Sequence, residues 1–247
     1  MAQDTVDKKQ ALSVHLKALR RVLVVSFAAI AVCFAVLLYG FCEPLVTFIL
    51  RPVTDRGIAT VSTAVSDALV MKFKICLIGG IVLAVPVIIW QIWSFIAPAL
   101  YPREKKLFAG LFFCMLVLFV IGVCFCYIVI LPLTVDLFMT TASDSAISNL
   151  WNVNDYFDFV LSFVLPFGIM FELPVAMFML AKKGKIRYET AAKARKYVIL
   201  VIAVLAAILT PPDVVSQIML MVPMIALYEL SVQIIRLIKP KSEENAG

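Results

Sequence analysis

Two carboxylates lie inside long apolar stretches of the 247-residue sequence, and both are candidates for chemistry within a membrane. Glu172 stands in PFGIMFELPVAMFML between Pro166 and Pro174, and Glu229 stands in a later stretch. An ionised carboxylate in hydrocarbon is costly, so such a residue usually marks a functional contact or a proton path. We expect Glu172 to offer a polar contact to another helix, because each proline also leaves a backbone carbonyl without its helical donor. A protonated Glu172 bonded to a neighbouring helix of the same chain is the structural alternative.

The two other acids of interest are open to plain structural explanations. Glu229 lies near the basic end of its stretch, so a local ion pair and a functional role are equally open. Glu104 stands in LYPREKKL, where three neighbouring residues carry positive charge. Physical chemistry alone favours a solvated salt-bridge cluster around Glu104, which contributes little to stability.

Catalytic and metal-binding patterns are missing from the sequence. His15 is the only histidine, the six cysteines include no CxxC pair, and no HExxH, GxxxxGK[ST] or GxGxxG motif occurs. We therefore expect no enzymatic activity, no metal and no cofactor. The net charge of +6 needs no nucleic acid to explain it, because membrane topology and anionic lipid headgroups suffice.

The composition indicates which elements must position these residues. The chain is 63% apolar with a mean hydropathy of +1.03, and its apolar residues form long runs. This pattern predicts an all-α integral membrane protein with one polytopic domain. Six spans are expected, at about 22–41, 73–95, 107–131, 159–180, 198–209 and 214–235. An acidic outer loop is expected between the third and fourth spans, with Asp136, Asp144, Asp155 and Asp158.

The fifth expected span is unusually short. Its 12 apolar residues, 198–209, reach about 18 Å as a helix, whereas a bilayer core is about 30 Å thick. Such a span must thin the membrane, be shielded by protein or leave a water-filled dent. Pro223 is expected to break the sixth span.

Positive residues predict the orientation. Four of them fall in segments expected outside, namely Arg51, Arg56, Lys72 and Lys74. The others gather in the N-terminal segment, around 103–106, across 182–196 and in the tail. By the positive-inside rule both termini are cytoplasmic. We thus expect an amphipathic inner segment at 1–21, a bundle at 22–237 and an inner tail at 238–247.

Four sequence motifs together resemble the TatC family, the signal-receptor component of the twin-arginine protein translocase. They are HLKALRRVL, FIAPALYPREKKL, FELPVA and LTPPDVVSQ, in this order, and the resemblance covers roughly residues 11–237. It implies a six-helix, glove-shaped bundle with a concave face and short fifth and sixth helices, in the inner membrane of the cell. It also implies binding of twin-arginine signal peptides of folded precursors at the cytoplasmic face, and export driven by the protonmotive force. The implied partners are single-span proteins of the TatA and TatB types, membrane lipids and further copies of the chain.

The resemblance assigns roles to individual positions. Glu104 matches the inner-loop acid that pairs with the guanidinium groups of the signal, a geometry that lysine fits poorly. The remaining signal-binding positions it implies are His15, Leu16, Leu19, Arg20, Phe95, Pro98, Leu100 and Tyr101. Glu172 matches an intramembrane glutamate that faces the concave side and meets a polar residue of a partner. Gln217 and Asp213 match the start of the sixth span and the outer turn before it, and Pro52 matches an outer-loop proline. From their own positions in the sequence, Pro174 and Glu229 are further candidates for a polar or partner-helix contact.

One position departs from the family pattern. The family's N-terminal motif reads His-Leu-x-Glu-Leu-Arg, but this chain has Ala18 in place of the acid and Lys17 beside it. This motif therefore supplies no carboxylate beside the arginine-binding acid that the resemblance implies at Glu104. We expect Glu104 to carry most of the arginine recognition, with Asp7 or Asp4 as further candidates.

Two other classes of function compete with a translocation receptor. A proton-coupled transporter of small solutes would use Glu172 and Glu229, but it predicts paired repeats with broken helices, and no such repeat is visible. An intramembrane enzyme would need a nucleophile with a base or two metal ligands inside the bilayer, and the sequence offers neither.

Overall fold

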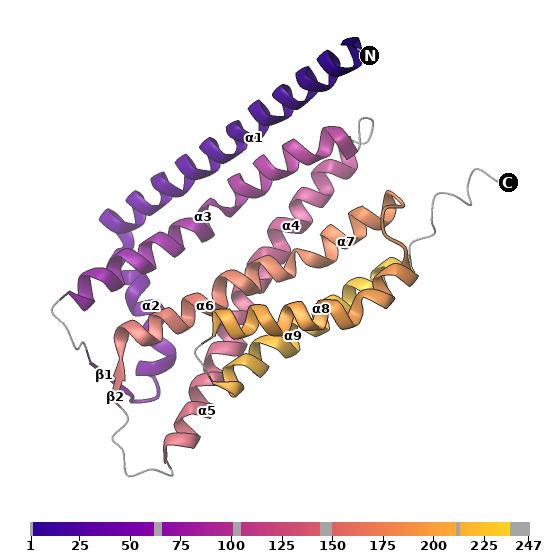
Figure 1. Cartoon of the computed structure of the whole chain (residues 1–247). Helices are drawn as coiled ribbons and strands as arrows, with labels where there is room; N and C mark the ends of the chain where they lie inside the picture. Colours follow the sequence, from indigo (N-terminus) through magenta and orange to yellow (C-terminus); the bar gives the residue numbers. More distant parts are fainter. Residues whose placement is uncertain (1, 62–65, 101–104, 144–149, 211–212, 238–247) are drawn as a thin grey trace. The chain divides into compact units, whose positions relative to one another are not determined.

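The chain is helical almost throughout (Figure 1). The computed structural model describes residues 2–61, 66–100, 105–143, 150–210 and 213–237, with side chains for 17–61, 66–94, 109–140, 151–210 and 213–237. The chain forms two compact units. The first comprises Met1–Cys42 and Phe73–Leu116, and the second comprises Glu43–Lys72 and Val117–Gly247.

Helix α1 (Ala2–Val36) and most of helix α3 (Asp67–Leu100) pack together in the first unit. A Cβ atom on Gly80 would lie 2.9 Å from the backbone nitrogen of Phe34, so glycine is what allows the two helix backbones to approach. The ring of Phe34 also packs 6.0 Å from that of Phe73. The first half of helix α4 (Lys105–Phe125) joins the unit through an edge-on contact between Phe112 and Trp90, at 5.1 Å.

The second unit holds most of the chain. Its elements are helix α2 (Cys42–Thr54), strand β1 (Ala59–Val61), the π-helical segment η2 (Cys126–Ile130), helix α5 (Leu131–Ser143), strand β2 (Leu150–Asn152) and helices α6 (Val153–Phe171), α7 (Leu173–Lys182), α8 (Tyr188–Leu209) and α9 (Val214–Arg236). A second π-helical segment, η1 (Leu37–Phe41), joins α1 to α2. The two strands pair in parallel, with Ala59 opposite Leu150.

A column of aromatic rings along α6 forms the core of the second unit. Phe159, Phe163 and Phe167 recur every four residues and therefore share one helix face. All three are buried, with ring centroids 4.7 Å and 6.3 Å apart along the column. Leu220 and Met224 of α9 belong to the same buried cluster, so the core links α6 to α9.

Two glycines let α4 and α6 pack closely. A Cβ atom on Gly168 would lie 2.5 Å from the ring of Phe119, and one on Gly122 would lie 2.9 Å from the carbonyl oxygen of Phe167. The second contact is to backbone, which cannot rotate away as a side chain can. The contact therefore sets where α6 lies against α4 just before Glu172.

Five segments within the described residues are long and apolar enough to cross a membrane. They are Lys17–Thr54, Asp67–Ser94, Ala109–Thr140, Val153–Lys182 and Val214–Arg236. Helix α8 is not among them, because polar residues fill its first half and its apolar part is the 12-residue stretch 198–209. The chain is a multi-pass, all-α membrane protein, as expected.

The described acidic residues of the predicted outer loop lie in helices. Asp136 lies in α5, while Asp155 and Asp158 lie in the first turns of α6. Asp144 falls outside the described residues. The helix continues past residue 131 because Leu131, Thr134 and Val135 share one face and are fully buried.

Candidate functional site

Glu172 lies where one membrane helix is interrupted and the next begins. Helix α6 ends at Phe171 and α7 starts at Leu173, with Glu172 between them at φ −76° and ψ −18°. Pro174 has no N–H to donate to the carbonyl of Met170, so the regular helical bonding stops here. The Glu172 N–H donates to the carbonyl of Ile169 at 3.1 Å, and the Glu172 carbonyl accepts from Ala176 at 3.0 Å. Pro174 therefore fixes the break, and the break fixes the position of Glu172.

Both carboxylate oxygens of Glu172 are buried without a hydrogen-bond partner in the described part of the chain. A buried polar group without a partner costs about 1–3 kcal/mol, and a charged one costs more. The predicted internal alternative, a bond from Glu172 to a neighbouring helix of the same chain, is therefore not seen among these residues. The carboxyl group has unused capacity to accept or donate a hydrogen bond.

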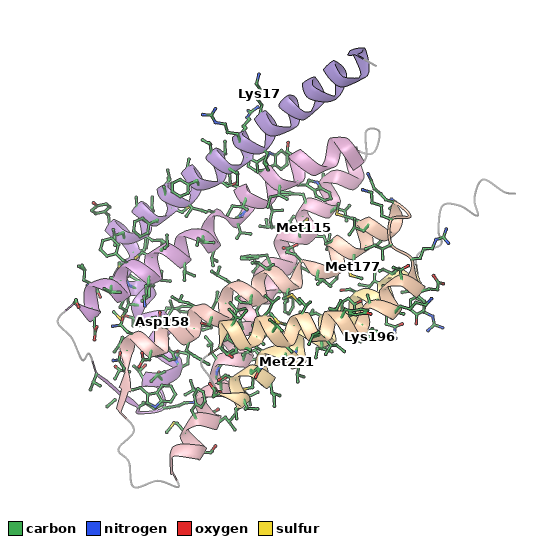
Figure 2. All side chains as sticks on the ribbon, viewed as in Figure 1. Lys17, Met115, Asp158, Met177, Lys196 and Met221 are labelled. Atoms are coloured by element: carbon green, nitrogen blue, oxygen red, sulfur yellow. The ribbon has the colours of Figure 1, made fainter. Side chains whose placement is uncertain are left out.

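Glu172 also lies between two hydrophobic clusters. Met170 and Phe171 pack against the aromatic core of α6, whereas Leu173 and Met177 pack against a second cluster built on Tyr228 and Val232 of α9. Figure 2 labels Met177 on α7, one turn beyond the break. The packing of these apolar residues on both sides holds the backbone of the break in place. The Glu172 carboxyl group is the one polar side chain between Met170 and Pro174.

Glu229 has a partner within the chain. Its Oε1 lies 2.7 Å from Nε of Arg195, so this ion pair joins α9 to the first half of α8. Each side chain is a little over one third exposed. The structure thus contains the local ion pair that the sequence allowed, and a functional role for Glu229 stays a prediction.

Gln217 makes a similar connection further along the same two helices. Its side-chain amide donates to the carbonyl of Ala203 at 3.2 Å. Near the other end, the Tyr228 hydroxyl donates to the carbonyl of Ala191 at 2.8 Å. With the Arg195–Glu229 pair, these contacts fix how α8 is rotated against α9.

Pro52 shapes the end of α2, where it is buried. As a proline it cannot donate to the carbonyl of Phe48, four residues earlier. The Tyr127 hydroxyl donates to that carbonyl at 2.6 Å, and the two rings stack at 4.4 Å. The Tyr156 hydroxyl donates to the next carbonyl, that of Ile49, at 2.9 Å. Two tyrosines thus bind the segment that Pro52 interrupts.

An ion pair holds the turn after α2. The guanidinium of Arg56 binds the carboxylate of Asp136 through two hydrogen bonds, at 2.5 Å and 2.9 Å, and donates to the carbonyl of Pro52 at 2.8 Å. The Asp136 carboxylate raises the pKa of Arg56 above its usual value. Sequence reasoning missed this pair, because the partners lie 80 positions apart.

Asp213 begins α9. Its carboxylate accepts a hydrogen bond from the backbone N–H of Ser216 at 2.6 Å, which is the N-cap arrangement. The position predicted as a structural loop residue is thus explained by its capping bond. Thr210 closes α8 in turn, since its hydroxyl donates to the carbonyl of Ala206 at 2.8 Å.

The predicted signal-binding residues are only partly described. Leu19 and Arg20 lie on α1 and are exposed. His15 and Leu16 belong to α1, and Phe95, Pro98 and Leu100 belong to the last turns of α3, but their side chains lie outside the described set. Tyr101 and Glu104 lie outside the described residues. Their grouping into one site stays a prediction.

No group of three histidine, cysteine, aspartate or glutamate side chains that could hold a metal ion is found among the residues that the structure covers.

Comparison with known proteins identifies the family. Residues 14–223 match the family model of the Sec-independent protein translocase protein (TatC). TatC of Carboxydothermus hydrogenoformans is 39% identical over 236 residues, covering 95% of this chain and 96% of the relative. TatC of Haemophilus influenzae is 34% identical, covering 98% and 94%.

The structural comparison agrees. A crystal structure of the twin-arginine translocase receptor TatC matches with a TM-score of 0.84 and 33% identity, covering 90% of this chain and 98% of that one. A second crystal structure, of a twin-arginine translocase receptor TatC in DDM, matches with a TM-score of 0.82 and 33% identity, covering 89% of this chain and 98% of that one. The chain therefore belongs to the TatC family, as a core subunit of the Sec-independent, twin-arginine protein translocase.

Proposed function

We propose that this TatC-family chain is the signal receptor of its translocase, located in the inner membrane with both termini in the cytoplasm. It binds the twin-arginine signal peptides of folded precursors at the cytoplasmic face. It also holds single-span subunits of the TatA and TatB types, and further copies of itself, for export driven by the protonmotive force. It acts by binding and has no catalytic role.

The observation that carries the partner-binding part is the unpartnered carboxyl group of Glu172. Its two oxygens are buried and lack a hydrogen-bond partner within the described chain. Because burial without a partner is costly, a polar side chain from outside the chain would stabilise this site when it binds. We infer that a polar side chain of a single-span partner helix contacts Glu172.

The break at Glu172 makes this contact specific. Pro174 ends the regular helix, and the packing of Phe171 and Leu173 into separate clusters holds the break in place. A group that is fixed in this way loses little conformational entropy on binding, which favours one partner geometry over others.

Signal recognition is assigned to the cytoplasmic side. Glu104 takes the arginine guanidinium groups, and the exposed Leu19 and Arg20 of α1 lie in the N-terminal motif that contributes to the same site. Because Ala18 replaces the second acid of the family, Asp7 or Asp4 is the candidate that assists Glu104. Unchanged precursor binding by Asp7→Asn would eliminate Asp7 from this role.

A crosslinking experiment tests the partner contact. A photoreactive residue at position 172 is expected to form adducts with a co-expressed single-span subunit. The same probe at Ile169, one turn earlier on α6 and 65% exposed, is the matched control. Adducts with lipid alone from position 172, with every partner subunit co-expressed, would contradict the proposal.

Substitution gives an independent measure of the same contact. Glu172→Gln keeps hydrogen-bonding capacity and is expected to retain most partner subunit during purification. Glu172→Leu removes that capacity and is expected to lose most of it. Equal recovery with both variants would show that the polar group is not what the partner recognises.

The transporter alternative requires Glu172 and Glu229 to relay protons. In the structure Glu229 forms an ion pair with Arg195 at 2.7 Å. A transporter of this kind would also be built from paired repeats, and no repeat is visible in the sequence. The receptor is therefore the function that we propose.

A further inference from the structure

One face of α8 combines positive charge with exposed apolar side chains. Lys193 and Lys196 lie in its first half, and Tyr197, Leu200 and Ile208 follow on the same side at helical spacing. All five are exposed, with values of 62% for Tyr197 and Leu200 and 74% for Ile208. Figure 2 labels Lys196 in the α8–α9 pair. This surface, which we term the α8 outer face, is not used by the site at Glu172.

The rotation of α8 is fixed, so the outer face is a constant feature. Its opposite side carries the buried residues Ala191, Ile202 and Ala206, which pack toward the core. Arg195 holds Glu229, and the carbonyls of Ala191 and Ala203 accept bonds from α9. Because these contacts hold the inner side of α8, Lys193 and Lys196 point away from α9.

The two lysines lie close to the membrane surface. The apolar part of α8, 198–209, is only about 18 Å long, whereas the core of a bilayer is about 30 Å thick. The polar first half of α8 therefore reaches no further than the headgroups, except where the bilayer becomes thinner. Tyr197 is a residue type that favours the interface between headgroups and hydrocarbon. The Lys196 ammonium lies 5.0 Å from the centre of the Tyr197 ring, which places charge and ring together at that level.

The neighbouring turn adds further positive charge. Helix α7 ends in a Schellman motif, in which Gly184 has φ +71° and the N–H groups of Gly184 and Lys185 donate to Ala181 and Leu180, at 2.8 Å and 3.0 Å. Ile186 packs into the cluster below this turn and anchors it. Partial loss of hydration and the charge of Lys185 both lower the pKa of Lys183, as expected where cations are held near one another.

The sequence around this face is rich in positive charge. Between Lys182 and Lys196 the sequence holds a single acid, Glu189, against seven lysines and arginines (Lys182, Lys183, Lys185, Arg187, Lys193, Arg195 and Lys196). Arg195 is paired with Glu229. The positive-inside rule explains on which side of the membrane these residues lie, but it does not require them to continue into an exposed apolar face.

We propose that the α8 outer face binds an anionic phospholipid, with its phosphate on Lys193 and Lys196 and its acyl chain along Leu200, Val204 and Ile208. Charge complementarity selects this occupant, because basic clusters at the cytoplasmic end of membrane helices attract anionic headgroups. The acyl chain covers side chains that the protein leaves exposed. A bound lipid would match the short span to the surrounding bilayer.

Lipid retention by the purified full chain tests this proposal. Native mass spectrometry would measure binding of dioleoylphosphatidylglycerol, an anionic lipid, and of zwitterionic dioleoylphosphatidylcholine with the same acyl chains. The wild-type chain is expected to prefer the anionic lipid. Lys193→Gln with Lys196→Gln is expected to weaken its binding on the order of tenfold, since each interfacial lysine contributes roughly a fivefold effect or less.

Matched variants separate this site from a general charge effect. Lys239→Gln with Lys241→Gln removes the same charge from the tail and is expected to leave binding unchanged. Lys193→Arg with Lys196→Arg keeps the charge and is expected to keep binding, which also controls for folding. Equal losses in the tail and α8 variants would overturn the proposal, as would unchanged binding in the α8 variant.

The source of the phosphate is tested in the same assay. Soluble glycerol phosphate, added at the concentration of the lipid, is expected not to displace dioleoylphosphatidylglycerol, because it lacks the acyl chain. Full displacement would overturn the lipid assignment in favour of a site for phosphate alone. Loss of a co-expressed partner subunit from the α8 variant, with lipid binding intact, would instead identify the face as a protein contact and refute the proposal. The readout needs neither signal peptide nor partner, so it is independent of the receptor function proposed above.

Discussion

Adding one methyl group at Gly122 is expected to destabilise the chain, although alanine is the better helix former. The new Cβ atom would lie 2.9 Å from the carbonyl oxygen of Phe167 and 2.9 Å from Cγ of Phe171. Ordinary contacts begin near 3.4 Å, so α6 must move by about half an ångström. The carbonyl belongs to a helix backbone, so no side-chain rotation can relieve the contact.

The size of the effect follows from two opposing contributions. Overpacking a tight helix contact costs about 1–3 kcal/mol, while replacing glycine by alanine within a helix gains about 1 kcal/mol. Gly110, in the same helix α4, has no heavy atom within 4 Å of its Cβ position, so Gly110→Ala isolates the gain. The free energies of unfolding of the two variants are therefore expected to differ by about 2 kcal/mol.

Thermal unfolding of the purified chain in detergent measures this difference. At about 3 °C per kcal/mol for a chain of this size, the unfolding midpoint of Gly122→Ala is expected about 6 °C below that of Gly110→Ala. Because Phe167 and Phe171 lie in the last turns of α6 before Glu172, recovery of partner subunits with Gly122→Ala should fall as well. Equal midpoints for the two variants would refute the view that the Gly122 contact sets the position of α6.

Three further substitutions test single contacts in the second unit. Asp213→Ala removes the N-cap of α9 and is expected to cost about 1 kcal/mol in unfolding free energy. Asp213→Asn can still accept the capping hydrogen bond, so its unfolding midpoint should stay close to that of wild type. Tyr127→Phe removes the hydroxyl that donates to the Phe48 carbonyl and is expected to cost about 0.5–1.5 kcal/mol in unfolding free energy, because this bond is exposed to solvent. Tyr197→Phe, at an exposed position, should leave the unfolding midpoint unchanged. Because the Arg195–Glu229 pair is partly exposed, Glu229→Gln is expected to cost about 1 kcal/mol or less, and high salt should reduce the difference from wild type. An effect of several kcal/mol for Glu229→Gln would contradict the assignment of Glu229 as a surface-linked ion pair.

The fold class follows from the sequence, because apolar runs of about 20 residues are typical of membrane-spanning helices. The same reasoning located the short apolar part of α8 and the proline-flanked glutamate, since both depend only on local spacing. It misplaces Asp136, Asp155 and Asp158 in a loop, because the apolar runs alone do not show that the helices α5 and α6 extend over these residues. Burial of Leu131, Thr134 and Val135 on one face keeps this segment helical. Asp136 still reaches solvent, because it lies on an exposed part of the same helix.

Contacts between distant parts of the chain were beyond sequence reasoning. Pro52 predicts that the Phe48 carbonyl needs a donor, but nothing local indicates that Tyr127 supplies it. The ion-pair partner of Glu229 is Arg195, which lies 34 positions earlier on another helix, so local spacing could not identify it. Glu172 is the opposite case, because the packed structure brings no donor to it among the described residues.

Binding of a twin-arginine signal peptide to the purified chain tests the receptor function most directly. The measurement compares Arg-Arg and Lys-Lys versions of one peptide, with wild type and Glu104→Gln. We predict that wild type prefers the Arg-Arg peptide and that Glu104→Gln abolishes the preference, because a carboxylate binds guanidinium through two parallel hydrogen bonds and ammonium through a point contact. A preference that survives Glu104→Gln would show that another acid reads the arginines, and equal binding of both peptides by the wild-type chain would contradict the proposed receptor function.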